Sequence, residues 1–231
     1  MARGSTFGQV VTKAREEAGQ SANASAGRNI TDALSQTVRR VYQRLHEGYD
    51  WPHLETYADF ALQEGIRYYG YPSKVSSDRI VAVYALETEG HYWREISYGI
   101  GPAEWNRYNP ERDERADPVR AWQRWESSLE VWPVPLTANG TLRVQGFPAP
   151  RYLTNESDVV DLDDNMVALY AAGEWLARQN TADAEIKMQE AQRLFDRLKA
   201  NQSSSNPIFP ISSGASDRRQ TNVIQIRAPR T

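Results

Sequence analysis

Residues 158–200 have the sequence DVVDLDDNMVALYAAGEWLARQNTADAEIKMQEAQRLFDRLKA, which predicts two consecutive amphipathic helices. In the first, apolar or small residues recur every three or four positions, at Leu162, Met166, Leu169, Tyr170, Gly173 and Leu176. The second repeats this spacing at Ala184, Met188, Ala191, Leu194, Phe195 and Leu198. Because an α-helix has about 3.6 residues per turn, each set forms one stripe that must be buried against other parts of the chain. Gln179-Asn180-Thr181 separates the two helices, and we expect Asn180 or Thr181 to cap the second.

An acidic segment leads into the first of these helices. Its carboxylates are Glu156, Asp158, Asp161, Asp163 and Asp164. A calcium site is the alternative interpretation, but the segment lacks the alternating ligands and central glycine of a helix-bounded calcium loop. Carboxylates in the first turn of a helix interact favourably with its dipole and free N–H groups, by about 0.3–1 kcal/mol each. We therefore expect these residues to cap the helix.

Two further helices are expected near the N-terminus. Residues 6–18 place Phe7, Val10, Val11 and Ala14 on one face, with Thr6 as the N-cap. The segment Gly19–Gly27 is rich in Ala, Ser, Gly and Asn, and its composition is typical of a linker.

The second of these helices is expected over Thr31–Glu47, ended by Gly48 and stapled at its first turn by Ile30. Its apolar stripe comprises Leu34, Val38, Val41, Tyr42 and Leu45. Arg39, Arg40 and Arg44 lie on the other side. We expect a solvated face there, with a contact to phosphate or to an acidic partner as the alternative.

The middle of the chain changes to a short, aromatic, β-type pattern. Glu89-Gly90 and Asn139-Gly140 are turn signals, and residues 99–118 form a charged surface excursion with a helical turn at Ala103–Arg107. Six or seven strands are expected, within 54–62, 66–71, 79–87, 92–98, 120–125, 129–132 and 141–147.

The order helix, helix, strands, helix, helix predicts an α+β protein. In this fold the outer helices form a bundle, and an antiparallel sheet or sandwich is inserted between them. We expect an N-terminal arm with a short helix at 1–28, the bundle at 29–49 and 156–201, the β lobe at 50–155, and an extended C-terminal tail at 202–231.

Composition excludes several classes of function. The chain has 231 residues, a formal charge of −3 and no cysteines, so disulfides, thiolate metal sites and cysteine nucleophiles are excluded. No apolar run approaches the roughly 20 residues of a membrane helix, and no secretory signal is evident. We therefore expect a protein that folds in a reducing cytoplasm. Its modest negative charge predicts no general affinity for nucleic acid or anionic membrane.

No catalytic, metal or cofactor motif is evident in the chain. Its three histidines are too scattered for a metal centre, and Gly99-Ile100-Gly101 precedes a proline instead of opening a helix. An enzyme that uses paired carboxylates stays open, because separation along the chain does not give the distance between two carboxyl groups, although no pair is singled out. We predict a non-enzymatic protein without cofactor or metal.

Tryptophan is abundant, with seven residues in the chain. Five of those in the predicted β lobe offer a sugar-stacking surface, which would make it a carbohydrate- or cell-wall-binding module: Trp93, Trp105, Trp122, Trp125 and Trp132. The alternative is that they fill the core of a small sandwich, since each aromatic ring buries a large area. Trp122 and Trp125 differ by an odd number and must face opposite sides of a regular strand, so we expect one of them in the core.

The C-terminal tail, 202–231, combines apolar and basic residues. The tail contains four arginines and one aspartate, so its net charge is +3. We predict docking on a partner, for example by adding a strand to an exposed sheet edge, with idle disorder as the alternative. The residues expected to dock are Ile208, Phe209, Ile211, Arg218, Arg219, Val223, Ile224, Ile226, Arg227 and Arg230.

The succession of motifs over Ile30–Ala200 resembles the head-to-tail connector (portal–tail adaptor) proteins of tailed bacteriophages. It runs through Asp50-Trp51-Pro52, YPSKV at 71–75, LEVWPVP at 129–135 and GTLRVQGF at 140–147 before the two closing helices. The resemblance lies in the order of these motifs more than in any one of them.

The resemblance implies a structural virion protein at the head–tail junction, assembled in the host cytoplasm. Such adaptors form rings, typically of twelve copies, beneath the portal protein. They extend the DNA channel, through which double-stranded DNA passes without sequence-specific binding, and offer the next tail or neck protein an attachment platform. Their C-terminal tails often reach along or into the portal, which implies that role for the tail here.

Overall fold

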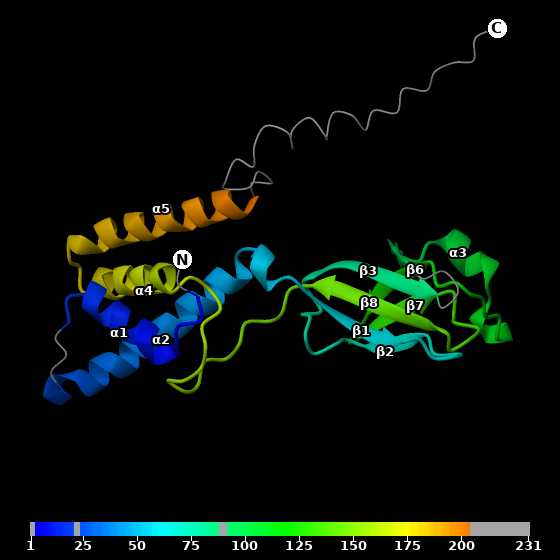
Figure 1. Ribbon diagram of the computed structural model, residues 1–231, viewed down its shortest axis with the longest axis horizontal. Coiled ribbons are helices and arrows are strands. Elements are labelled where there is room, and N and C mark those ends of the chain that lie inside the picture. The colour runs from blue at the N-terminus through cyan, green and yellow to red at the C-terminus, as the bar shows by residue number, and fades with distance from the viewer. Residues whose placement is uncertain (1–2, 21–23, 88–91, 204–231) are drawn as a thin grey trace, which may run out of the picture.

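The computed structural model describes residues 3–20, 24–87 and 92–203. Two lobes lie end to end and give the described chain an elongated shape (Figure 1). One lobe is made of helices: α1 (Phe7–Glu17), α2 (Ala24–Glu47), α4 (Asp164–Arg178) and α5 (Asp183–Ser203). The other holds the strands, together with α3 (Pro102–Arg107) and the 3-10 turn Pro110–Arg112. A second 3-10 turn, Pro52–Leu54, lies against the helical lobe, where Leu54 packs on the core. The predicted α+β class is confirmed, and the predicted extended tail lies outside the described residues.

The β lobe is a sandwich of two four-stranded sheets. The first has the order β1-β8-β3-β4 and is antiparallel throughout, with β1 at Thr56–Ala61, β8 at Gly140–Gly146, β3 at Ile80–Glu87 and β4 at Trp93–Glu95. The second has the order β2-β7-β6-β5, with β2 at Tyr68–Gly70, β7 at Ser128–Trp132, β6 at Ala121–Trp125 and β5 at Ser97–Tyr98. Alternate residues of both sheets face inward and form one core, which includes Val83, Trp122, Leu129, Val131, Leu142 and Val144.

Residues 92–98, predicted as one hairpin partner, divide between the two sheets. β4 pairs antiparallel with β3, whereas β5 pairs parallel with β6. Ile96 lies between them, buried, and its N–H donates to the carbonyl of Val83 at 2.9 Å. The chain therefore crosses from one sheet to the other at a single residue, and the described residues contain eight strands where the sequence predicted six or seven.

The helical lobe buries the apolar stripes that the sequence predicts. Thr6 and Gln9 form a capping box at the start of α1, and the face of Phe7, Val10, Val11 and Ala14 is buried. The stripe of α2, from Leu34 to Leu45, joins the same core together with Val160, Leu162 and Met166. None of the described helices combines the length and the apolarity needed to cross a membrane.

The predicted linker Gly19–Gly27 is wrong in its second half, because α2 begins at Ala24. The alanines of this segment are strong helix formers, whereas its Gly, Ser and Asn residues suggested a loop. Ile30 consequently lies inside α2 and cannot act as the predicted staple.

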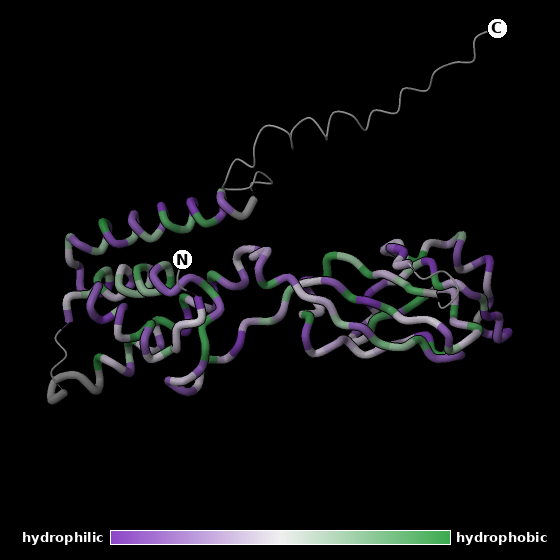
Figure 2. The backbone as a smooth tube through the Cα atoms, in the orientation of Figure 1, coloured by the Kyte–Doolittle hydropathy of each residue, from purple (hydrophilic) through white to green (hydrophobic). Residues whose placement is uncertain are grey.

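The two closing helices are confirmed as a packed pair. At the turn between them Asn180 has φ +54°, and the backbone N–H and hydroxyl of Thr181 both donate to the carbonyl of Leu176. The side chain of Thr181 therefore closes α4, where the sequence predicted a cap for the second helix. Figure 2 shows apolar and polar residues alternating along α5, as expected for a helix with one side on α4.

Candidate interaction surfaces

The acidic segment before α4 forms bonds within the helical lobe. Asp163 is the N-cap of α4, accepting the Met166 N–H at 3.1 Å, and is 5% exposed. Asp164 is fully buried; it accepts the Ser5 hydroxyl at 2.7 Å and forms an ion pair with Lys13. Burial alone would raise the pKa of Asp164, but the bonds to Lys13 and Ser5 outweigh it and hold that pKa below its ordinary value. Asp163 thus caps α4, as predicted, and Asp164 ties α1 to that helix, whereas Asp158 and Asp161, also expected to cap it, bind elsewhere.

The remaining aspartates of this segment stabilise the loop that precedes α4. Asp158 accepts the backbone N–H groups of Thr154 and Asn155 at 2.6 and 2.7 Å, and Asp161 accepts the Tyr42 hydroxyl at 2.7 Å. Burial and this bond to Asp161 raise the pKa of Tyr42. Within the described ranges, no cluster of His, Asp or Glu has the geometry to hold a metal ion.

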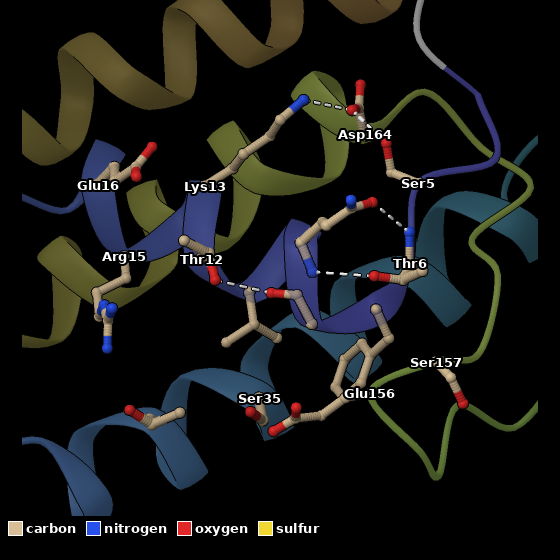
Figure 3. A pocket seen from close by; sticks show the side chains of 15 residues that line it. Ser5, Thr6, Thr12, Lys13, Arg15, Glu16, Ser35, Glu156, Ser157 and Asp164 are labelled. Atoms are coloured by element: carbon tan, nitrogen blue, oxygen red, sulfur yellow. Dashed lines mark hydrogen bonds and ion pairs between the residues drawn. The ribbon is translucent and has the colours of Figure 1, made fainter. Parts of the chain in front are cut away.

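A polar groove of about 960 Å³ runs along α1, between α2 and the loop at 156–157. Figure 3 shows Lys13 and Ser5 both pointing toward Asp164 at one end of the groove, with Thr6 and Glu156 farther along it. The groove owes its shape to close backbone contacts, since the Gly8 N–H donates to the Glu156 carbonyl at 2.9 Å. Its most buried acid, Asp164, is paired with Lys13 and accepts the Ser5 hydroxyl, and these contacts hold the N-terminal segment against α4.

The arginines of α2 bind acceptors within the chain, while the side chains of Arg40 and Arg44 also remain about half exposed to solvent, as predicted. Arg39 donates to the carbonyls of Leu153 and Thr154. Arg40 and Arg44 both form ion pairs with Glu174 on α4, whose side chain is 15% exposed. Burial alone would raise the pKa of Glu174, but the two guanidinium groups lower it. The sequence analysis left open a contact of these arginines with an acidic partner. That partner is Glu174 of the same chain.

Most tryptophans of the β lobe serve the core. Trp122 and Trp132 are buried, and the Trp105 ring packs against Trp132 with 4.5 Å between centroids. Trp125 is 50% exposed, which confirms that Trp122 and Trp125 face opposite sides of β6. A sugar-stacking surface needs several free ring faces, and this arrangement favours the core interpretation.

The outer face of the first sheet carries a group that we name the aromatic face: Tyr57, Asp59, Trp93 and Arg143. The Arg143 guanidinium lies 4.0 Å from the Trp93 ring centroid and 5.3 Å from that of Tyr57. It donates two hydrogen bonds of 2.7 Å to Asp59, which lower the pKa of that carboxyl. Tyr, Trp and Arg are enriched at the energetic centres of protein interfaces. The helical lobe lies beyond the end of the sandwich and leaves this face uncovered (Figure 1).

Sequence reasoning did not single out the aromatic face. Alternation along β1 and β8 places Tyr57, Asp59 and Arg143 outward, but their proximity depends on the register that pairs Asp59 with Arg143. The tail residues predicted to dock, Ile208 to Arg230, lie outside the described residues.

An elongated two-lobe α+β chain with an open aromatic face fits a structural protein that contacts other proteins. A family model for the SU10 adaptor protein matches residues 5–214. The chain belongs to the SU10 adaptor protein family, and its resemblance to phage adaptors is confirmed at that level. A comparison with curated proteins found no match.

Family membership indicates a structural phage adaptor, a component of the virion that contacts other head or tail proteins of the phage.

Proposed function

We propose that this adaptor is a head-to-tail connector, which docks as a ring of about twelve copies beneath the portal protein. The observation that carries the proposal is the family match over 5–214, which spans both lobes. In this proposal the ring extends the DNA channel, and one lobe of each copy offers an attachment platform to the next tail or neck protein.

A ring of identical copies needs two different surfaces on each copy, because each chain meets one neighbour with each surface. The helical lobe supplies broad helical surfaces on opposite sides, with α5 at one side and α2 at the other (Figure 1). The aromatic face on the other lobe is then available for the tail component. Its Arg143 is already oriented by Asp59 and Trp93, so little side-chain entropy is lost on binding.

The C-terminal tail is the part of the chain that we assign to portal docking. Arginines at 218, 219, 227 and 230 can pair with acidic groups of the portal, and Ile208, Phe209 and Ile211 can serve as apolar anchors on it.

The charge of the chain suits a channel through which DNA slides. Each copy carries a formal charge of −3, and the copies of a ring add their charges. Tight binding of DNA depends on neutralising phosphates with Lys and Arg, and this balance does not favour it. We therefore assign double-stranded DNA the role of a passing polymer without sequence-specific contacts.

Electron microscopy of the protein mixed with its portal tests this function. We expect rings seated on one end of the portal, coaxial with its channel. A sample in which portals stay bare at saturating adaptor concentration would contradict the proposal. Retention on a glycan array or on peptidoglycan would support the carbohydrate-binding alternative, whereas the connector predicts none.

A further inference from the structure

The junction between the two lobes depends on few contacts. All extensive contacts between described elements join helix to helix or strand to strand. Two chain segments cross the junction, one after α2 and one after β8 (Figure 1). Such a junction bends unless a specific group holds it.

Arg79, just before β3, is that group. Its guanidinium donates to the carbonyl of His46 at 2.9 Å, to the carbonyl of Tyr49 at 3.0 Å and to the Asp50 carboxylate at 2.7 Å. These acceptors lie in and just beyond the last turn of α2, where carbonyls lack partners within the helix and where the helix dipole favours a positive charge. A residue of the β lobe thus caps a helix of the other lobe.

Arg79 also holds the second connecting segment. Its guanidinium lies 5.0 Å from the ring centroid of Phe147, the first residue after β8, and its carbonyl accepts the Phe147 N–H at 3.0 Å. Gly146 allows this approach, because a Cβ at that position would lie 2.4 Å from the Arg79 carbonyl oxygen. The Arg79 side chain is only 15% exposed, so its bonds to the two carbonyls are partly shielded from water, whereas its partner Asp50 is 66% exposed.

We propose that Arg79 fixes the direction of the β lobe relative to the helical lobe. Both segments that cross the junction contact this one side chain, the first through hydrogen bonds to its guanidinium and the second through the Phe147 ring. A guanidinium is a rigid planar fork of five donors, so its bonds to three separate acceptors restrict rotation as well as separation. The inference concerns the isolated chain and stands independently of the proposed ring.

The absence of cysteine from the chain permits a direct test. Gln189 on α5 and Glu95 on β4 are exposed, and replacing both with cysteine gives one spin-label site on each lobe. Double electron–electron resonance on the full chain then measures the distribution of distances between the lobes. With Arg79 present we expect one narrow distribution.

Arg79→Gln should broaden and shift this distribution. Arg79→Lys should also broaden it, because an ammonium keeps the charge but cannot span the three acceptors. Arg143→Gln is the matched control: Arg143 is likewise paired with a carboxylate and stacked on aromatic rings, but wholly within the β lobe. We expect this variant to keep the distribution of the parent chain.

If folded Arg79→Gln and Arg79→Lys keep the mean and the width of the inter-lobe distance distribution, the proposal is overturned. Equal broadening of that distribution in Arg143→Gln would also overturn it. Circular dichroism establishes folding of each variant. If Arg79→Gln does not fold, Arg79→Lys and Asp50→Asn decide the question, since Asp50 is largely exposed and its change spares the carbonyl contacts. The proposal requires broadening in both.

Discussion

Glu174 lies between Arg40 and Arg44 and binds both guanidinium groups. The carboxylate is mostly buried, whereas each arginine side chain is about half exposed. The carboxylate therefore depends on the arginines for compensation of its lost hydration, and each arginine can return to water if the pair is broken.

Replacing Glu174 with Gln should lower the free energy of unfolding by about 1–3 kcal/mol, because a charge-assisted pair is lost in a shielded site. Urea unfolding measures this change. The control is Glu190→Gln on α5, where an exposed pair with Lys187 at 3.5 Å should contribute less than about 0.5 kcal/mol. Equal losses in the two variants would show that burial of Glu174 has no energetic consequence.

His46 makes stability depend on pH. Its Nδ1 lies 3.3 Å from the Arg79 guanidinium, which can only donate, so Nδ1 accepts and the ring is neutral. Its Nε2 is buried without a hydrogen-bond partner in the described part of the chain. Burial lowers the pKa of His46 from its ordinary value of 6.5, and Arg79 lowers it further, while the nearby carboxylates of Asp161 and Glu47 oppose the shift. The Tyr42 ring also packs against it.

The sign of this dependence follows from proton binding. Below about pH 6.5 the unfolded chain binds a proton at His46 that the folded chain does not, so the free energy of unfolding falls as pH decreases through this range. Urea unfolding between about pH 8 and pH 5 measures the slope, above the range where carboxylates titrate. His46→Asn should remove the slope, and His53→Gln, which changes a histidine with an exposed hydrogen bond, should retain it. A slope that survives in His46→Asn would assign the effect elsewhere.

The packing of α5 on α4 depends on a close approach at Gly173. A Cβ there would lie 2.7 Å from Sδ and 2.9 Å from Cγ of Met188. The neighbouring stripe includes Ala184, Ala191 and Leu198, all buried. The helices α4 and α5 therefore approach closely where Gly173, which has no side chain, faces the flexible side chain of Met188.

Gly173→Val should destabilise the protein by about 1–3 kcal/mol through overpacking, even though glycine is a poor helix former. Met188→Ala in the same chain should recover much of the loss by vacating the space, and thermal unfolding of the single and double variants measures this coupling. Additive effects would mean that Met188 is not the residue that meets the new side chain.

Helices and strands follow from periodicity in this chain because each has one buried face. The stripes of α1, α2, α4 and α5 were predicted on this basis, and so were the strands of the β lobe, as an antiparallel sheet or sandwich. Periodicity identifies the polar face of α2 but not what lies opposite it, which is why Glu174 was not predicted as the partner of Arg40 and Arg44. The division of 92–98 between two sheets depends on Ile96 entering the core, and the Arg79 contacts join residues 29 to 33 positions apart. Such features depend on tertiary packing, which no local pattern specifies.

The proposed docking role assigns folding and assembly to different parts of the chain. The cores of the two lobes are formed by residues between Phe7 and Leu198, and the family match continues to residue 214. The predicted docking residues, from Ile208 onward, lie beyond α5. Folding and portal docking should therefore respond to different changes in the sequence.

Deletion of residues 204–231 should leave the melting temperature unchanged while abolishing binding to the portal. The deletion removes four arginines and two apolar segments, 208–211 and 223–226, but no part of the described core. Because binding of this kind combines charge-assisted pairs with buried anchors, loss of either half should weaken it. Calorimetric melting and co-sedimentation with the portal measure the two properties on the same sample.

Two further variants of the full chain separate the contribution of the arginines to docking from that of the apolar residues. Substituting Glu for Arg218, Arg219, Arg227 and Arg230 should abolish docking if acidic portal groups are the partners, and Ser at Ile208, Phe209 and Ile211 should do so if these residues are anchors. Ala at Ser212 and Ser213 is the control in the same segment and should dock normally. A deletion variant that still forms rings on the portal would place the docking surface on the folded lobes and leave the tail without this role.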